Sequence, residues 1–427
     1  MIVALLALLA AVMLALGFEM FLVMGVPTLL AQQGLFPLMP QIVIPQKMMA
    51  GVNVSTLLAI PFIILAADIM ARGTIAERLM NLVRAWLGHR RGGIGHSAVT
   101  SCMAFGAVCG SAPATVAALG RFLHPELVKA GYAQRFSLGL IASSAECALL
   151  IPPSITLLIY GWLTGTSIAA LFAGGLAVGI VLGLALMAQV HVVTLRSGAA
   201  AAPRQSRAER LAALKAGLLA LGMPAIILGG IYGGVFTATE AAAVSVAYAL
   251  LVEMGIYRSL SWRDVVRIAE SSAVTVTAIF VLLAMGSLVS YFVTLGRVPD
   301  TLIAFLAQHE VGWVEFLLVV NLVFLVAGMF VDPNSILLVL VPTLFPVATA
   351  LGIDPVHFGL VACLNICIGM ITPPFGLDLF VTASTLRKPV EAVIAGIWPF
   401  VLTNLGVLAV VTYVPAVSTA LPRLLGY

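Results

Sequence analysis

The chain consists of long apolar runs separated by short polar segments. The runs cover residues 2–30, 52–71, 93–120, 137–161, 169–193, 213–235, 240–257, 270–293, 313–349, 356–386 and 393–414. Most contain about 20 residues, which is the length at which a helix spans a hydrocarbon core of ~30 Å. The pattern predicts an all-α polytopic membrane protein.

Four of these runs are interrupted. Small or polar residues break 93–120 at Gly110-Ser111 and 313–349 at Asp332-Pro333, while Pro152-Pro153 and Pro373-Pro374 lie inside 137–161 and 356–386. Proline ends a helix because it has no N–H and its ring clashes with the preceding turn. In lipid, such breaks are tolerated only where the freed backbone lines a buried polar site. We therefore expect two re-entrant helical hairpins (93–120 and 313–349) and two proline-broken helices (137–161 and 356–386).

The interruptions occur once in each half of the chain at matching spacing. Pro113 lies 39 residues before Pro152, and Pro333 lies 40 residues before Pro373. Amphipathic segments at 75–87 and 298–309 precede the two hairpins, as expected of helices lying flat at the membrane interface. We expect two inverted-topology repeats, 1–193 and 240–427, joined by a linker and a connecting helix over 194–239.

The distribution of basic residues tests this topology. If the N-terminus is cytoplasmic and neither hairpin crosses, 18 of the 21 Lys and Arg residues fall in cytoplasmic loops, and only Lys47, Arg297 and Arg423 lie outside. The bias largely disappears if a hairpin is a full crossing. The count favours nine crossings and a cytoplasmic N-terminus.

Composition narrows the class of protein further. Hydrophobic residues make up 62% of the chain and charged residues only 9%, with a mean hydropathy of +1.15. Residues 1–18 carry no Lys or Arg, and none precedes Lys47, so the basic start of a secretory signal is missing and we expect a retained helix. The five cysteines all lie in apolar runs, which argues against a disulfide framework. We expect a lipid bilayer as the surroundings and no nucleic-acid partner.

Hairpin tips and broken helices place helix ends together inside the membrane. Helix N-termini attract anions, whereas unwound carbonyl groups are the hard oxygen ligands that alkali cations bind. An anionic solute would therefore use these N-termini and nearby polar groups, because no basic residue lies in the expected pocket. The candidates for solute binding are Thr115, Ser154, Asp332, Asn334 and Gly376.

At these positions the chain resembles the large membrane subunit (DctM type) of the TRAP, or tripartite ATP-independent periplasmic, transporters. The resemblance is carried by LLAIPFIILAADIMARG at 57–73, GSAPATVAALG at 110–120, IPPSI at 151–155, GVFTATEAAA at 234–243, and LGIDPVHFGLV with TPPFG within 351–376. It implies an elevator-type mechanism, Na+ coupling, a small DctQ-type membrane subunit and a DctP-type periplasmic substrate-binding protein. It also implies small organic acids as solutes, such as C4-dicarboxylates and sialic acids.

The resemblance further implies two Na+ sites. The first would involve Ser111 and the backbone around Ala148, Ile151 and Pro153, and the second would involve Gly328, Gly369, Thr372 and the carbonyl near Phe375. The chain departs from the family pattern at Cys109, where Ser is usual, and at Glu146-Cys147-Ala148, where a Thr-Leu-Gly run is usual. Both departures concern the first site.

Glu146 is a carboxylic acid inside a spanning helix, where such groups are costly and are by default functional. It could supply charge to the first cation site or bind a proton, so that H+ replaces Na+ at one site, or it could be a hydrogen-bonded packing residue. Asp378 has the same alternatives, including pairing with a neighbouring helix. Asp68 and Glu240 lie near span ends, where a solvated or capping role is as compatible as a functional one, and His357 is either a solute contact or structural.

Other functions fit less well. A stand-alone cation- or proton-coupled carrier of the same architecture is the main alternative, and adjacent genes for the two partner proteins would discriminate. A channel is disfavoured because two hairpins favour alternating access over an open pore. We find no catalytic constellation and no phosphate-binding loop, so the chain is expected not to be an enzyme.

Overall fold

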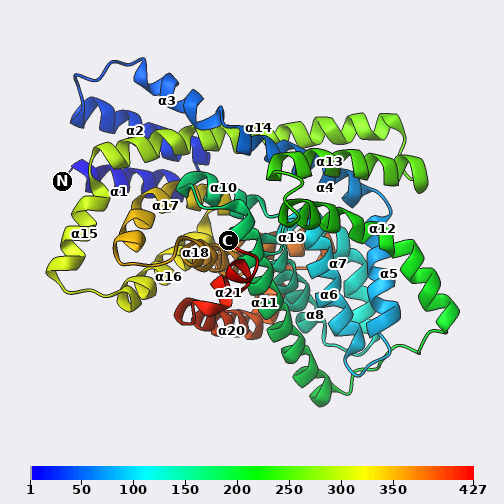
Figure 1. Cartoon of the computed structure of the whole chain (residues 1–427). Helices are drawn as coiled ribbons and strands as arrows, with labels where there is room; N and C mark the ends of the chain where they lie inside the picture. The colour runs from blue at the N-terminus through cyan, green and yellow to red at the C-terminus, as the bar shows by residue number, and fades with distance from the viewer. Residues whose placement is uncertain (1) are drawn as a thin grey trace.

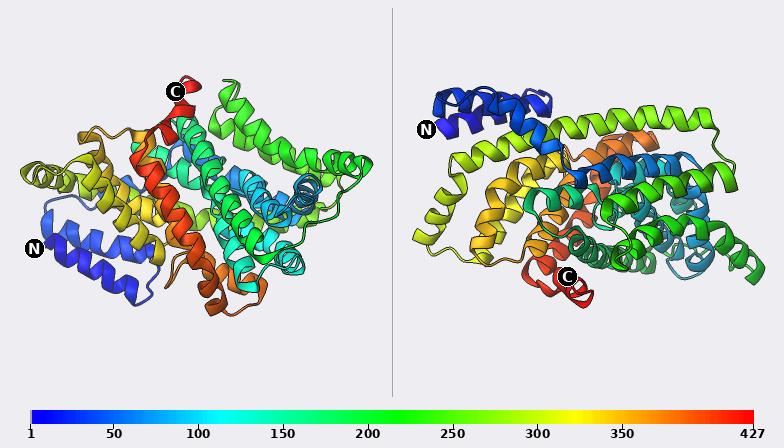
Figure 2. Two further views of the ribbon diagram at one scale, coloured as in Figure 1. Left: turned by 90° about the horizontal axis from the view of Figure 1, so that it is seen from below. Right: turned by 45° about the horizontal axis from the view of Figure 1, so that its top comes forward.

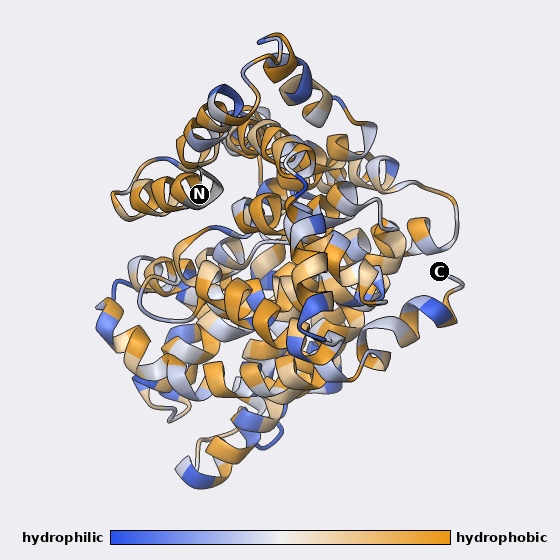
Figure 3. Cartoon of the chain, turned by 90° about the vertical axis from the view of Figure 1, so that its left-hand side faces the viewer, coloured by the Kyte–Doolittle hydropathy of each residue, from blue (hydrophilic) through white to orange (hydrophobic). Residues whose placement is uncertain are grey.

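The computed structural model describes residues 2–427, and within that range every regular element is a helix. Among the described residues, nine helices or runs of joined helices are long and apolar enough to span a membrane. Hydrophobic residues run along most helix lengths, while hydrophilic ones concentrate at helix ends and loops (Figure 3). On α16 (Trp313–Phe330), the exposed residues Leu318, Leu322 and Val326 repeat every fourth position, so this stripe faces outward as lipid contact requires. The predicted polytopic all-α class is confirmed.

The N-terminal part of the chain differs from the prediction. Residues 2–30 are not one crossing but belong to two short helices, α1 (Ile2–Ala15) and α2 (Met20–Leu35), which pack together. The turn between them contains Gly17 at φ +78° and Glu19, the residue before α2. At 1.5 Å per residue the helices are about 21 and 24 Å long, shorter than a hydrocarbon core of ~30 Å. The expected first crossing is therefore wrong, and the cytoplasmic location of the N-terminus stays a prediction.

A long brace crosses the molecule. It consists of α14 (Trp262–Leu295) and, beside it, α3 (Val43–Val52), the short 3-10 helix η1 (Ser55–Leu58) and α4 (Ala59–Arg72) (Figure 1). Ser287 donates to the Lys47 carbonyl at 3.1 Å, and Ser272 donates to Asp68 at 2.6 Å near the other end. These two hydrogen bonds hold α14 antiparallel to the segment that runs from α3 to α4. Asp68 thus joins α4 to α14 through a hydrogen bond.

Further helices flank the brace, either in direct contact with it or packed on a helix that is. They are α5 (Ile75–Leu87), α12 (Arg207–Tyr232), α13 (Ala238–Leu250) with a π-helical turn (Leu251–Ile256), and α15 (Val298–Gln308). Helix α13 packs on α4, and α12 packs on both α5 and α13. Glu240 and Thr237 form a reciprocal cap at the start of α13, the capping role expected for Glu240. The linker before α12 is docked by backbone bonds, from Ala200 to the Ala130 carbonyl and from Ala202 to the Gly88 carbonyl.

The remaining helices form the interior group. They are α6 (Gly93–Cys109), α7 (Ala112–Lys129), α8 (Gln134–Ala145), α9 (Cys147–Leu150), α10 (Ile155–Thr164), α11 (Ile168–Ser197), α16 (Trp313–Phe330), α17 (Pro333–Ala350), α18 (Pro355–Met370), α19 (Leu377–Leu386), α20 (Val390–Tyr413) and α21 (Ala416–Leu424). Figure 2 shows this group alongside the brace from two further directions. All four interruptions fall at the residues that the sequence singled out.

The two halves of the interior group exchange contacts reciprocally. Helix α10 packs against α17 while α19 packs against α7, and α8 packs against α20 while α11 packs against α18. Each half therefore places its segment after the double proline against the hairpin of the other half. This exchange is what a two-fold arrangement of repeats produces, and the inverted orientation and the repeat boundaries stay predictions.

Candidate functional site: two hairpin tips against two helix breaks

The first hairpin tip lies directly on the first helix break. Helix α6 ends at Cys109, and Gly110 turns the chain with φ +60°, a conformation that favours glycine. A Cβ at Gly110 would collide with the carbonyl oxygen of Pro153. One turn earlier, a Cβ at Gly106 would lie 2.6 Å from the Cα of Ala148. The backbones of the tip and the break are therefore in contact.

The double proline leaves carbonyl groups at this contact without their helical donors. In a continuous helix the carbonyls of Ala148 and Leu149 would accept from residues 152 and 153, which are prolines without N–H. Leu149 is compensated, because the Ser154 hydroxyl donates to its carbonyl at 2.5 Å. Ser154 also accepts from Leu157 N at 3.2 Å and caps α10. Pro152, which has neither an N–H nor a hydroxyl group, cannot donate to the Ala148 carbonyl.

The side chains of the first tip are largely engaged with one another. Ser111 accepts from Ala114 N at 3.4 Å and caps α7. Thr115 is fully buried and donates to the Ser111 carbonyl at 2.9 Å, and its hydroxyl lies 3.1 Å from the Cys109 sulfur. Buried Ile151 lies against Gly179 of α11. The expected first-site residues Ser111, Ala148, Ile151 and Pro153 are thus brought together.

The second tip repeats the arrangement. Helix α16 ends at Phe330, and Asp332 caps α17 by accepting from Asn334 N and Ser335 N at 3.1 Å each. A Cβ at Gly328 would lie 2.9 Å from the Cα of Gly369, so this pair corresponds to Gly106 and Ala148. Phe375 is 58% exposed, and its ring lies 5.5 Å from that of Phe330.

The second break also offers oxygen atoms. The Gly369 carbonyl loses its helical donor because residue 373 is proline, and it accepts from Thr372 N at 2.9 Å. The Thr372 hydroxyl donates to the Ile368 carbonyl at 2.6 Å and keeps lone pairs free for another contact. Gly376 is buried before α19. Gly328, Gly369, Thr372 and Phe375 therefore surround one break.

The expected solute-binding residues differ in accessibility. Thr115 and Ser154 are fully buried and their hydroxyls are bonded within the chain, whereas Asp332 and Asn334 are partly exposed at the second tip. His357 contacts Ser418 Oγ at 2.7 Å and the Thr412 carbonyl at 3.1 Å, so it joins α18 to the C-terminal helices. These contacts fit the structural role for His357 rather than a solute contact.

Glu146 joins α8 to α9 and is fully buried. Its carboxyl group interacts with that of Asp378 on α19, which is also fully buried. The sequence indicated both acids but not that they meet.

Sequence reasoning missed other buried polar residues. Glu253, in the π-helical turn, accepts from Thr74 N at 3.1 Å and Ile75 N at 3.2 Å, and Ser259 also donates to it. Asn404 of α20 donates to Ser143 of α8 at 3.0 Å. Their only sequence signal is a polar residue inside an apolar run.

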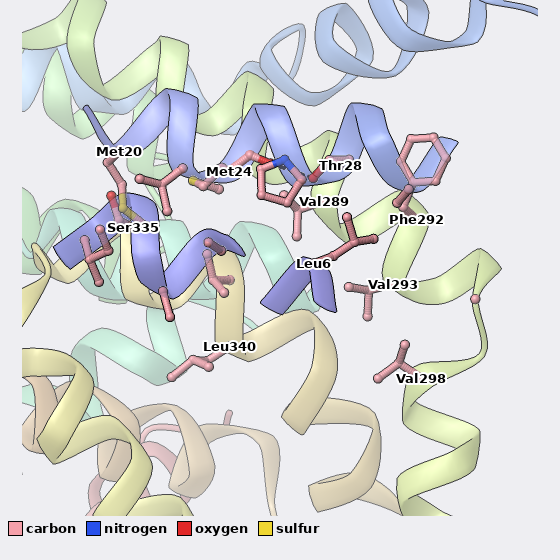
Figure 4. Close-up of a pocket in the computed structure, with 18 of the residues that line it drawn as sticks. Leu6, Met20, Met24, Thr28, Val289, Phe292, Val293, Val298, Ser335 and Leu340 are labelled. Atoms are coloured by element: carbon pink, nitrogen blue, oxygen red, sulfur yellow. Dashed lines mark hydrogen bonds between the residues drawn. The ribbon is translucent and has the colours of Figure 1, made fainter. Parts of the chain in front are cut away.

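One cavity of about 390 Å³ opens beside the second hairpin, between α1, α2, α14 and α17. Its walls are almost entirely aliphatic and aromatic, with Thr28 and Ser335 as the hydroxyl-bearing residues (Figure 4). An anionic solute would lose its hydration there without gaining polar partners. We therefore do not assign the solute to this cavity.

Paired helix breaks that meet hairpin tips inside an apolar helical protein are typical of membrane transporters. Residues 1–417 match the family "Tripartite ATP-independent periplasmic transporter, DctM component". The chain belongs to this family. DctM proteins work with a small DctQ-type membrane subunit and a periplasmic DctP-type binding protein, and they are transporter subunits rather than enzymes.

Several proteins named as TRAP transporter permeases are similar to this chain over most of their length. The ectoine/5-hydroxyectoine TRAP transporter large permease protein UehC of Ruegeria pomeroyi is 41% identical, with 87% of each chain covered. The ectoine permease TeaC of Halomonas elongata is 40% identical over 91% of each chain. The C4-dicarboxylate permease DctM of Pseudomonas aeruginosa is 41% identical over 87% of each.

A solved structure shares the fold at much lower sequence identity. The YdaH transporter of Alcanivorax borkumensis, described as having an unusual topology, matches with a TM-score of 0.59 and 16% identity, covering 86% of each chain. At this identity the likeness concerns the fold alone.

Proposed function

We propose that the chain is the transport subunit of a Na+-coupled importer of small organic acids, which a periplasmic binding protein delivers. The observation that carries the proposal is the doubled contact between a hairpin tip and a proline break, at Gly106 with Ala148 and at Gly328 with Gly369. Each contact surrounds carbonyl groups whose helical donors are replaced by proline. Hard carbonyl and hydroxyl oxygens are the ligands that suit Na+.

The residues present fit two Na+ ions. Ser111 with the carbonyls around Ala148, Ile151 and Pro153 would hold the first, and Thr372 with the backbone of Gly328, Gly369 and Phe375 would hold the second. A bound cation would add positive charge near the starts of α7 and α17, where a solute carboxylate is favoured by the helix N-termini. Asn334, partly exposed at the second tip, can donate to such a carboxylate.

The solute class follows from this charge arrangement. Relatives are named for ectoine, C4-dicarboxylates and sialic acid, and each of these solutes carries a carboxylate. We propose a carboxylate-bearing solute of the same size range. The chain would act in the bacterial inner membrane with its N-terminus in the cytoplasm.

The proposed movement is an elevator, in which the interior helices slide against the brace. The brace is held internally by Ser287 with Lys47 and by Ser272 with Asp68. The two halves of the interior group are interleaved through α10 with α17 and α19 with α7. A unit interleaved in this way would move as one body.

Transport into proteoliposomes tests the proposal. The chain would be reconstituted with its small subunit and binding protein, and uptake of labelled ectoine and of a C4-dicarboxylate would be measured. We expect uptake only with an inward Na+ gradient and only with the binding protein. Uptake driven by a pH gradient without Na+ would overturn the coupling, and uptake without the binding protein would favour the stand-alone carrier.

A further inference from the structure

Two carboxylic acids from different halves of the chain meet in the interior. Glu146 lies between α8 and α9, and Asp378 is in the first turn of α19. Both side chains are 0% exposed, and the two carboxyl groups are close enough to interact. Over two hundred residues separate them in sequence, so their meeting is a product of the interleaved fold.

Nothing in the described part of the chain balances these two acids. All four carboxyl oxygens lack a hydrogen-bond partner of acceptable geometry, and neither acid forms an ion pair with Lys, Arg or His. Two facing carboxylates in a low-dielectric interior repel each other, and each has also lost its hydration. A bound cation would remove this repulsion, and so would a proton shared between the two carboxyl groups.

A third group has the same deficiency at the same place. Thr382 follows Asp378 by one turn on the same face of α19, it is 0% exposed, and its hydroxyl has no partner. Helical threonines commonly donate to the carbonyl four residues earlier, as Thr372 does to Ile368. The free Thr382 hydroxyl adds a neutral oxygen to the carboxyl oxygens, which makes a set of hard ligands.

We propose that Glu146, Asp378 and Thr382 bind a sodium ion in addition to the two ions at the helix breaks. This site deepens the proposed function and rests on it. It would join α9 of one half to α19 of the other, so that occupancy ties the two proline breaks together. Glu146 then serves a shared site rather than the first cation site alone.

Thermal unfolding of the purified protein tests the site without requiring transport. Unfolding midpoints would be measured over a sodium chloride series, with choline chloride keeping the ionic strength constant, and the series would be repeated at several pH values. We expect Na+ to raise the midpoint of the native chain, because a ligand that binds only the folded state stabilises it. In Glu146→Gln, Asp378→Asn and Thr382→Val, the Na+ concentration for half-maximal stabilisation should rise roughly tenfold or more, since the first two changes each remove a negative charge and the third removes the hydroxyl oxygen.

The matched control is Ser245→Ala, which removes a buried hydroxyl that is bonded within α13. Its Na+ response should equal that of the native chain. If an acid variant fails to fold, Thr382→Val still tests the site, because it keeps the shape and both acids.

The outcomes separate the additional site from the proposed function. Na+-independent uptake by the native chain defeats Na+ coupling as a whole. Na+-dependent uptake with an unchanged Na+ response in all three variants defeats only the additional site. A variant whose midpoint loses its pH dependence while keeping its Na+ response assigns the acids to a proton and overturns the sodium site.

Discussion

Buried carboxylates in this protein have two different surroundings. Glu253 is fully buried, yet its oxygens accept from Thr74 N, Ile75 N and Ser259, so it caps the start of α5 from a neighbouring helix. Glu146 and Asp378 have no such donors. Satisfied acids hold elements together, whereas unsatisfied ones leave oxygen atoms available for a ligand.

The role of Glu253 predicts a loss of stability on substitution. Glu253→Ala should destabilise the fold by roughly 1–3 kcal/mol, because the amides of Thr74 and Ile75 would remain buried without an acceptor. The unfolding midpoint in detergent measures this effect. Glu270→Gln changes an exposed acid on α14 and should leave the midpoint unchanged. Equal midpoints for both variants would contradict the capping role.

The contact between Gly328 and Gly369 predicts an effect of a single methyl group. In Gly369→Ala the new Cβ would lie 2.5 Å from the Cα of Gly328, so α16 and α18 must separate at the second break. We expect Na+-dependent uptake to fall at least tenfold, because ligand oxygens displaced by even ~1 Å bind poorly. Gly406→Ala on α20, where a Cβ meets nothing within 4 Å, should transport normally. Normal uptake by Gly369→Ala would show that transport does not depend on the close packing of Gly328 and Gly369.

At the scale of elements, the proline breaks expose backbone groups that an ordinary helix would pair. Helices α8 and α9 stop before Pro152-Pro153 and α18 stops before Pro373-Pro374, and in both cases the chain resumes as a helix within a few residues. The interruption is local, and hairpin tips cover both breaks. The breaks are therefore compatible with a stable apolar interior.

Restoring the missing donors should abolish function without unfolding the protein. Replacing Pro152 and Pro153 together by alanine provides N–H groups for the carbonyls of Ala148 and Leu149, which favours a continuous helix. We expect uptake to be lost while the folded yield in detergent is kept. Pro224→Ala, a proline inside unbroken α12, serves as the control and should transport. Na+-dependent uptake by the double variant would show that the break is dispensable.

At the scale of the whole molecule, the brace and the interior group meet where α14 packs on α17. A Cβ at Gly286 would lie 2.8 Å from the Cβ of Leu338 at this interface. A side chain added at Gly286 would therefore push α14 and α17 apart at the proposed sliding surface.

An elevator predicts that a side chain placed on this surface hinders transport. Gly286→Val should lower Na+-dependent uptake roughly tenfold or more, because the added carbons collide with Leu338 and oppose movement of α17 along α14. Gly229→Val on α12, where a Cβ meets nothing within 4 Å, should transport normally. Normal uptake by Gly286→Val would argue against sliding at this surface.

The amino-acid sequence determined the helical class and the position of each interruption, because hydrophobic run length, glycine and proline act locally. It failed at residues 2–30, where Gly17 and Glu19 divide an apolar run that length alone assigned to one crossing. Neither periodicity nor composition reports which helices become neighbours.

Only the tertiary structure decided the meeting of Glu146 with Asp378, the capping of α5 by Glu253 and the docking of Gly328 on Gly369. These contacts join residues far apart in the chain, and they depend on how the two halves interleave. Local preference sets where a helix stops, whereas close packing of the whole chain sets what the exposed backbone and buried acids face.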